Sequence, residues 1–183
     1  MTNGLVVMTP TTVAKTGASS TATINADGSV TFGLCESLSL NGVFTGDYDN
    51  YMVAIRHVQT GGTSNFYGRF RVGGVDNTTA SSYTSQELNA YGTTVNANRG
   101  SYDFGYFPTS SSGTHSASTI YFFGPYLTQP TPWRQVTANG YLSAAIFDTA
   151  GTHNQSVSYD GFSFTAPSPR DISGLLTVFG FNQ

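Results

Sequence analysis

The sequence predicts an all-β protein, an antiparallel β-sandwich of the jelly-roll kind with about ten strands. Three observations support this fold class. Apolar and polar residues alternate in short segments along most of the chain, Gly, Ser, Asn and Asp separate these segments, and no long segment shows a 3.6-residue period. Strands that do not alternate with helices argue against a parallel α/β sheet. Short strands at regular spacing are typical of sandwiches and barrels.

The first predicted element is a hairpin over residues 21–33, whose strands flank the turn Ala26-Asp27-Gly28. Asp-Gly is a strong signal for a tight turn between two strands. Residues 8–20 are rich in Thr and Ser and predict an extended arm that leads to the hairpin. We therefore expect an arm and hairpin at 1–36 and a sandwich domain at 37–183, together one folded unit.

The clearest predicted strand covers residues 51–58. In the next one, residues 65–72, Arg69 and Arg71 face away from Phe66 and are expected to meet solvent or a partner. The remaining predicted strands lie at 37–40, 83–91, 101–107, 117–123, 133–141, 144–147, 156–158, 162–165 and 175–181.

The chain is unusually poor in charge. Charged residues make up 9% of its 183 residues, against about 25% in an average soluble domain. The formal net charge is −3, the single lysine is Lys15, and the arginines are scattered. Because no basic stripe could follow a phosphate backbone, nucleic-acid binding is not expected. An uncharged polar surface is suited to packing against copies of itself.

Export and membrane signals are also missing from the sequence. Cys35 is the only cysteine, so neither an intramolecular disulfide nor a cysteine metal site is expected, and Cys35 is interpreted as a small apolar residue near a strand. No signal peptide and no run of about 20 apolar residues is recognised. We expect synthesis in a host cytoplasm, no membrane association, and release by lysis or within a particle.

Searches for catalytic motifs give no candidate. The segment Gly161–Thr165 fails the G-x-S-x-G pattern at its last position. For His57, His115 and His153 no partner that would orient a catalytic base is identifiable, so each is interpreted as an ordinary surface or core histidine. The sequence therefore predicts no enzyme, no catalytic residue and no cofactor.

Most acidic residues lie beside Gly, Asn or Thr, as turn aspartates do. The segment 46–50 is similar to the start of a calcium loop, but it lacks the Gly at position six and the Glu at position twelve. No metal site is predicted. Glu87 is the one acid in the middle of a predicted strand, and we expect it to pair with Arg69 or Arg71 across strands as a structural ion pair.

Aromatic residues leave two interpretations open. Tyr102, Phe104 and Tyr106 alternate on one face of a predicted strand, and Trp133 follows a Pro-Thr-Pro segment. These rings either form an exposed platform that stacks on sugars or fill a core between two sheets about 10 Å apart. Core filling is favoured for phenylalanines, whereas tyrosines fit either role. No ligand-binding residue is assigned.

Several segments resemble small bacteriophage virion proteins. The resemblance is carried by Ser37-Leu38-Ser39-Leu40-Asn41-Gly42-Val43-Phe44, Asp47-Tyr48-Asp49-Asn50-Tyr51-Met52-Val53, Phe70-Arg71-Val72-Gly73-Gly74-Val75-Asp76, Ser158-Tyr159-Asp160-Gly161-Phe162 and Ile172-Ser173-Gly174-Leu175-Leu176-Thr177-Val178-Phe179-Gly180-Phe181. Together these segments cover residues 37–181. They place turn-forming residues between strands and end in a strand that alternates small and large residues.

The resemblance implies a non-enzymatic structural protein of a phage particle that forms homotrimers of sandwich domains. Our leading expectation is capsid decoration, as a cement or head-fibre protein that contacts the major capsid protein, because the sequence shows no shaft, coiled coil or repeat. The first alternative is a tail-fibre or receptor-binding tip that contacts tail proteins and adheres to host-surface glycans. The second is a polysaccharide hydrolase, which requires two carboxylates facing each other across a cleft.

Overall fold

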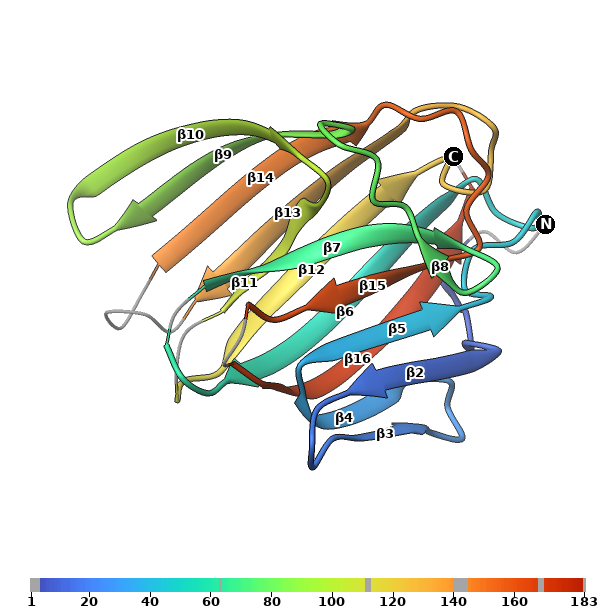
Figure 1. Ribbon diagram of the computed structural model, residues 1–183, viewed down its shortest axis with the longest axis horizontal. Helices are drawn as coiled ribbons and strands as arrows, with labels where there is room; N and C mark the ends of the chain where they lie inside the picture. Colours follow the sequence, from blue (N-terminus) through green and yellow to red (C-terminus); the bar gives the residue numbers. More distant parts are fainter. Residues whose placement is uncertain (1–3, 63, 111–112, 140–144, 168–169, 183) are drawn as a thin grey trace.

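The computed structural model describes residues 4–62, 64–110, 113–139, 145–167 and 170–182, and within them it contains strands but no helix. In the described part of the chain, sixteen strands form two antiparallel sheets, which are stacked face to face (Figure 1). The prediction of an all-β antiparallel sandwich is thus confirmed, with more strands than the ten expected. No helix among these residues could cross a membrane.

The large sheet has the strand order β10-β9-β14-β13-β12-β6-β16-β4-β3, with β1 paired to β16. Its strands are β1 (Val6–Val7), β3 (Thr21–Ile24), β4 (Val30–Cys35), β6 (Asn50–Gln59), β9 (Tyr83–Tyr91), β10 (Thr94–Tyr102), β12 (Ser116–Phe123), β13 (Thr131–Asn139), β14 (Ala145–His153) and β16 (Ile172–Phe181). The small sheet has the order β11-β7-β15-β5-β2, with β8 paired to β7. Its strands are β2 (Thr12–Thr16), β5 (Ser37–Asn41), β7 (Ser64–Val72), β8 (Val75–Asp76), β11 (Gly105–Ser110) and β15 (Gly161–Thr165).

The N-terminal segment belongs to both sheets. Strands β3 and β4 form the predicted hairpin, and the Asp27 carboxylate accepts the backbone N–H of Ser29 at 3.0 Å within its turn. The stretch expected to be an extended arm, residues 8–20, contains β2, which pairs with β5. It is preceded by β1, which pairs with β16. Its Thr-rich sequence suits such edge strands, because threonine favours extended backbone.

Aromatic side chains fill the space between the sheets. Phe70, Phe122, Phe162 and Phe44 are buried and pack against one another with ring centroids 5.2 to 6.4 Å apart. Trp133 is also part of this core, since it is 2% exposed. The core-filling interpretation therefore holds for Trp133.

The large sheet extends farther than the small sheet, so part of its inward face is left uncovered. Strand β11, at the edge of the small sheet, lies against β12 and β13 of the large sheet. Strands β9 and β10 extend beyond that edge, as the hairpin at the upper left of Figure 1 shows. The inward face of this hairpin is therefore only partly covered.

Candidate functional site

A cleft of about 260 Å³ opens where the β9–β10 hairpin passes the edge of the small sheet. The residues that line it come from β7, β9, β10 and β11 and are Asn65, Ser85, Glu87, Asn98, Arg99, Gly100, Tyr102 and Tyr106. Polar groups of the large sheet thus face aromatic residues at the end of β10 and on β11. An open cleft with a few convergent polar groups is the usual form of a ligand site.

Glu87 lies on the inward face of β9 and is 7% exposed. Its Oε1 accepts hydrogen bonds from the Nδ2 of Asn89 at 2.9 Å and of Asn98 at 3.3 Å, and its Oε2 accepts one from the Nδ2 of Asn65 at 3.4 Å. Two of the three bonds are long, so the carboxylate retains accepting capacity toward the cleft.

The prediction that Glu87 forms an ion pair with Arg69 or Arg71 is wrong. Arg69 pairs with Asp103 at 2.7 Å and Arg71 pairs with Asp76 at 3.1 Å, and Glu87 takes part in none of the ion pairs found in the described ranges. The arginines lie on the outward side of β7, whereas Glu87 points inward from β9. Amide dipoles rather than a cation therefore stabilise its charge.

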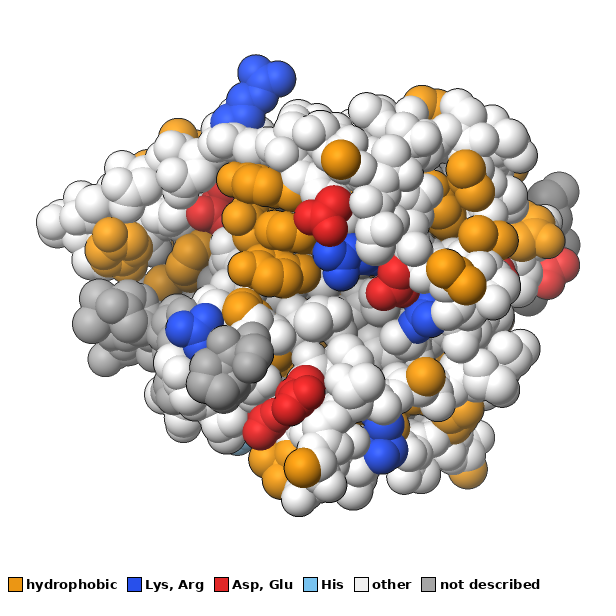
Figure 2. Space-filling model, viewed as in Figure 1, with side chains coloured by type: hydrophobic (Ala, Val, Ile, Leu, Met, Phe, Trp, Pro, Cys, Tyr) orange, Lys and Arg blue, Asp and Glu red, His pale blue; other side chains and the backbone are white. Residues whose placement is uncertain are grey.

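Tyr102 and Tyr106 line the other side of the cleft, and their rings pack with those of Phe104 and Tyr67. These four rings are here called the aromatic wall. Tyr102 stacks on Phe104 with centroids 5.1 Å apart and planes 5° apart, and Tyr67 stacks on the same ring at 4.0 Å. Tyr106 meets Phe104 edge-on at 5.4 Å. Tyr102 is 36% exposed. Figure 2 shows hydrophobic side chains gathered on this face beside acidic and basic groups.

The aromatic wall depends on a bend in the chain. The sequence predicted one strand over 101–107, but β10 ends at Tyr102 and β11 begins at Gly105. Arg69 holds the bend, because its Nε donates to the backbone oxygen of Asp103 at 2.9 Å and its Nη2 to the carboxylate at 2.7 Å. Its guanidinium carbon also lies 6.0 Å from the centre of the Phe104 ring.

Two local features direct the tyrosines toward the cleft. The register between β11 and β7 shifts between Tyr106 and Thr109, as at a β-bulge, which re-aims side chains at a sheet edge. Gly100 gives the Tyr102 ring room to lie back over β10, since a Cβ at this position would fall 2.3 Å from the ring. Any larger residue would push Tyr102 away from its place in the aromatic wall.

The cleft is lined by one acidic residue, Glu87, one basic residue, Arg99, and tyrosine hydroxyls. Burial, and then a hydrogen bond with Tyr102, raise the pKa of Tyr106 well above its ordinary value. Its hydroxyl is therefore neutral at any physiological pH and can both donate and accept. Arg99 is the basic residue on the lining, and it comes from the exposed edge strand β10.

The other residues singled out in the sequence are not brought into the cleft. His57 is buried and contacts Phe66 edge-on at 5.8 Å, His115 is exposed, and His153 is buried between the sheets, where its Nε2 lies 2.6 Å from the Tyr159 hydroxyl. Cys35 is buried, and burial raises the pKa of its thiol. Throughout the described ranges, no group of three metal-ligating side chains is found.

Sequence reasoning missed the asparagines of the cleft. Asn65, Asn89 and Asn98 lie on three different strands, and their amides converge only because β9 pairs with β10 and passes over β7. The one available signal was the run Asn89, Asn96 and Asn98 around the turn at Gly92. Asparagine is so common in turns that this run alone predicts a loop.

No protein-family model and no curated protein matches the sequence. Among solved structures, the chain is similar to the basic winged bean lectin crystallised with Tn-antigen, at 7% identity and a TM-score of 0.35, over 97% of this chain and 99% of the lectin. It is also similar to the SPRY domain of human HERC1, at 10% identity and a TM-score of 0.25, over 85% and 99% of the two chains. A third is the binding domain of botulinum neurotoxin serotype G, at 8% identity and a TM-score of 0.24, over 94% of this chain and 44% of that one.

Proposed function

We propose that this chain is a non-enzymatic surface protein of a phage particle, and that its cleft binds an uncharged saccharide. One observation carries the proposal for the cleft. Glu87 is a buried carboxylate without a cationic partner among the described ion pairs, and it faces an open cleft whose other wall is aromatic. Burying a carboxylate without a cationic partner lowers folding stability, so the presence of Glu87 at this position indicates a functional role.

The chemistry of the cleft matches that of a neutral sugar. Sugar hydroxyls can donate to the carboxylate of Glu87 and accept from the amides of Asn65 and Asn98. A hydrogen bond to an ionised acceptor is about twice as strong as a neutral one. The C–H face of a sugar ring would pack on the half-exposed ring of Tyr102, which combines an apolar body with a polar edge. The lining holds one acidic and one basic residue, Glu87 and Arg99, so it favours neither an acidic nor a basic sugar.

The arrangement favours binding over hydrolysis. Glycoside hydrolysis by the usual route requires two carboxylates across the scissile bond. Glu87 is the only carboxylate among the residues that line the cleft, and Asp103 at the neighbouring bend is held by Arg69. The hydrolase alternative has no comparable support.

A glycan array tests the cleft. The wild-type chain is expected to bind a subset of neutral glycans, and Tyr102→Ala is expected to weaken that binding by about tenfold or more through loss of ring packing. Tyr126→Ala is a matched control, because Tyr126 is similarly exposed, at 41%, but lies outside the cleft. Equal loss in both variants, or no glycan bound by the wild type, would contradict the proposal.

The location on a phage particle rests on the resemblance of residues 37–181 and is tested separately. Quantitative mass spectrometry of purified particles should detect this chain. Hundreds of copies, in ratio with the major capsid protein, would support capsid decoration. A few dozen copies or fewer would place it on the tail as an adhesin, and absence from particles would contradict a virion role altogether.

A further inference from the structure

Three of the four strands that end the two sheets have features that discourage pairing with another chain. Among the described strands, the large sheet ends in β10 and β3 and the small sheet in β11 and β2. Strand β3 has four residues, β2 carries Lys15, and β11 contains Pro108 and a register shift between Tyr106 and Thr109. Short length, lysine, proline and bulges are the means by which natural sheets keep their edges unpaired.

Strand β10 has none of these features. Its nine residues pair with β9 in one register without a shift, and they include neither proline nor lysine. Arg99 is the single charged residue among them. None of the described strands pairs with the outer edge of β10, the edge that faces away from β9. Hydrogen-bonded and non-hydrogen-bonded pairs alternate in an antiparallel ladder, so every second residue of β10 directs its backbone N–H and C=O to this outer edge.

The outer edge of β10 is accessible along its length. The β9–β10 hairpin extends beyond the small sheet, at the upper left of Figure 1, and β10 is its outer strand. Every residue of β10 is exposed or half-buried, and Val95 is 71% exposed. Nine residues with a rise of about 3.4 Å each give an edge of about 31 Å. The edge can therefore accept a partner strand of ordinary length.

Symmetry and charge identify the partner strand. Two copies of one strand that pair antiparallel are related by a two-fold axis, so each copy meets the other through the same residues. Charged residues are 9% of the chain and its formal net charge is −3, so two copies repel each other little. We infer that β10 pairs antiparallel with β10 of a second copy, which joins the two large sheets into one.

A register centred on Ala97 suits the side chains of both copies. Residues 94–100 of one copy then lie opposite residues 100–94 of the other. Asn96 faces Asn98, and their side-chain amides can donate to and accept from each other. Val95 faces Arg99, whose aliphatic stem can cover it. The two Arg99 side chains are not opposite each other, so no like charges meet directly across the join.

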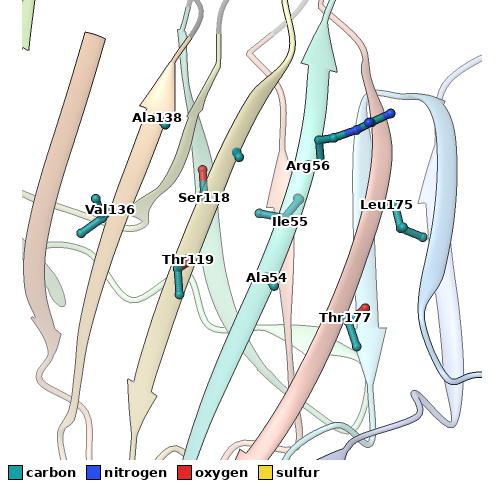
Figure 3. A pocket seen from close by; sticks show the side chains of 10 residues that line it. Ala54, Ile55, Arg56, Ser118, Thr119, Val136, Ala138, Leu175 and Thr177 are labelled. Carbon is teal, nitrogen blue, oxygen red and sulfur yellow. The ribbon is translucent and has the colours of Figure 1, made fainter. Parts of the chain in front are cut away.

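The joined sheet leaves the clefts and the outward face of each copy free. The two-fold axis is perpendicular to the sheet, so both clefts open on the same side. A shallow apolar groove of about 540 Å³ lies over β6, β12, β13 and β16 on the outward face (Figure 3), and β14 and β9 separate it from β10. Bivalent binding to a glycan-bearing surface would follow from the proposed function of the cleft, whereas the pairing does not depend on that function.

Sedimentation velocity of the full chain from about 1 to about 100 μM tests the pairing, because interfaces smaller than about 1,200 Å² form weak complexes. The wild type is expected to shift from its 19.4 kDa monomer to a dimer over this range. Ala97→Lys and Ala97→Glu each place like charges opposite each other at the axis, and each should weaken dimerisation by about tenfold or more. An equimolar mixture of the two variants should dimerise again, because opposite charges then meet.

Ala14→Lys is the control, since Ala14 is an exposed alanine on the edge strand β2 and its substitution should leave dimerisation unchanged. Circular dichroism and a thermal melt establish that the variants are folded. A wild type that is monomeric at about 100 μM would overturn the inference. A dimer that persists in Ala97→Lys, or a mixture of the charged variants that stays monomeric, would also overturn it. Saccharide binding by Ala97→Lys is expected to survive, because Ala97 does not line the cleft, so the two proposals can fail independently.

Discussion

At the residue level, the burial of Glu87 lowers the free energy of unfolding. Glu87 is 7% exposed, and its hydrogen-bond partners within the described residues are the side-chain amides of Asn65, Asn89 and Asn98. Amides stabilise a buried charge less than a cation or full hydration would, so the native state carries a desolvation penalty. Residues that lower stability in this way are typical of functional sites.

Replacing Glu87 with Gln separates stability from binding. The neutral amide removes the desolvation penalty, and the Asn65 and Asn98 amides can turn to present their oxygens to it. We expect the free energy of unfolding to rise by about 1 kcal/mol while saccharide affinity falls about tenfold. Denaturant melts and calorimetric titration measure the two quantities. A large loss of stability together with unchanged affinity would show that Glu87 is purely structural.

His153 makes the stability of the fold sensitive to acid. The imidazole is fully buried, lies 4.0 Å from the Tyr83 ring, and bonds the Tyr159 hydroxyl. Burial lowers the pKa of His153 from 6.5 to about 4. The unfolded chain therefore binds a proton at a higher pH than the native chain does. His153 contributes its full stability above pH 6.5, and that contribution is lost as the pH falls toward 4.

As the pH falls from 6.5 toward 4, the free energy of unfolding is expected to fall by about 3 kcal/mol through His153, at about 1.4 kcal/mol per pKa unit. His153→Gln should lower stability at pH 7 and flatten its dependence on pH between 6.5 and 4. His115→Gln is the control, because His115 is exposed. Melting temperatures measured across this pH range test the assignment, and equal slopes in wild type and His153→Gln would refute it.

At the scale of elements, the connection between β10 and β11 positions the aromatic wall. Arg69 holds it through two hydrogen bonds to Asp103, a forked geometry that lysine cannot reproduce. We expect Arg69→Lys to weaken saccharide binding severalfold and to speed hydrogen exchange at 102–105, with less than about 1 kcal/mol lost in stability.

Arg134→Lys provides the matched comparison, since Arg134 forms the same kind of forked pair with Asp148 on the outward face. Exchange at 102–105 should be unchanged in that variant. If both variants behave alike at the bend, Arg69 does not hold the connection in the way described.

The sequence predicted the strands with strong alternation and missed those without it. Residues 51–58 and 65–72 became β6 and β7, because alternate residues such as Val53, Ile55, Phe66 and Phe70 are buried in the core. Strand β10 was missed because it is an edge strand with exposed residues on both faces. The predicted strand at 156–158 has no strand pairing; its neighbour Tyr159 is instead tied by a backbone bond from its N–H to Pro125.

The site was less predictable than the fold for a physical reason. Tyr102, Phe104 and Tyr106 were recognised as a cluster, but their side-by-side stacking requires the bend at 103–104 that alternation does not reveal. The partners of Glu87 come from three strands, its own strand β9, the neighbouring β10 and the more distant β7, which supplies Asn65 from 22 residues away. Such pairings depend on which strands are neighbours in a sheet, which periodicity does not encode.

At the scale of the whole molecule, the large sheet has two distinct halves. Near β6 and β16 its inward face is apolar and packs on the small sheet. Toward β9 the inward residues become polar, and a hydrogen-bonded series from Ser118 through Thr137 and Gln135 reaches Thr149. This polar half ends at Glu87 and the cleft, while its outward side carries the apolar groove.

We propose that the cleft between Glu87 and the aromatic wall binds an uncharged saccharide. The most direct test is an NMR titration of the ¹⁵N-labelled chain with a neutral glycan selected by the array. Binding in the cleft should produce saturable shifts in the side-chain amide signals of Asn65 and Asn98 and in the backbone signals of residues 98–106. Shifts confined to other surfaces, or none at a glycan concentration that saturates the array, would contradict it.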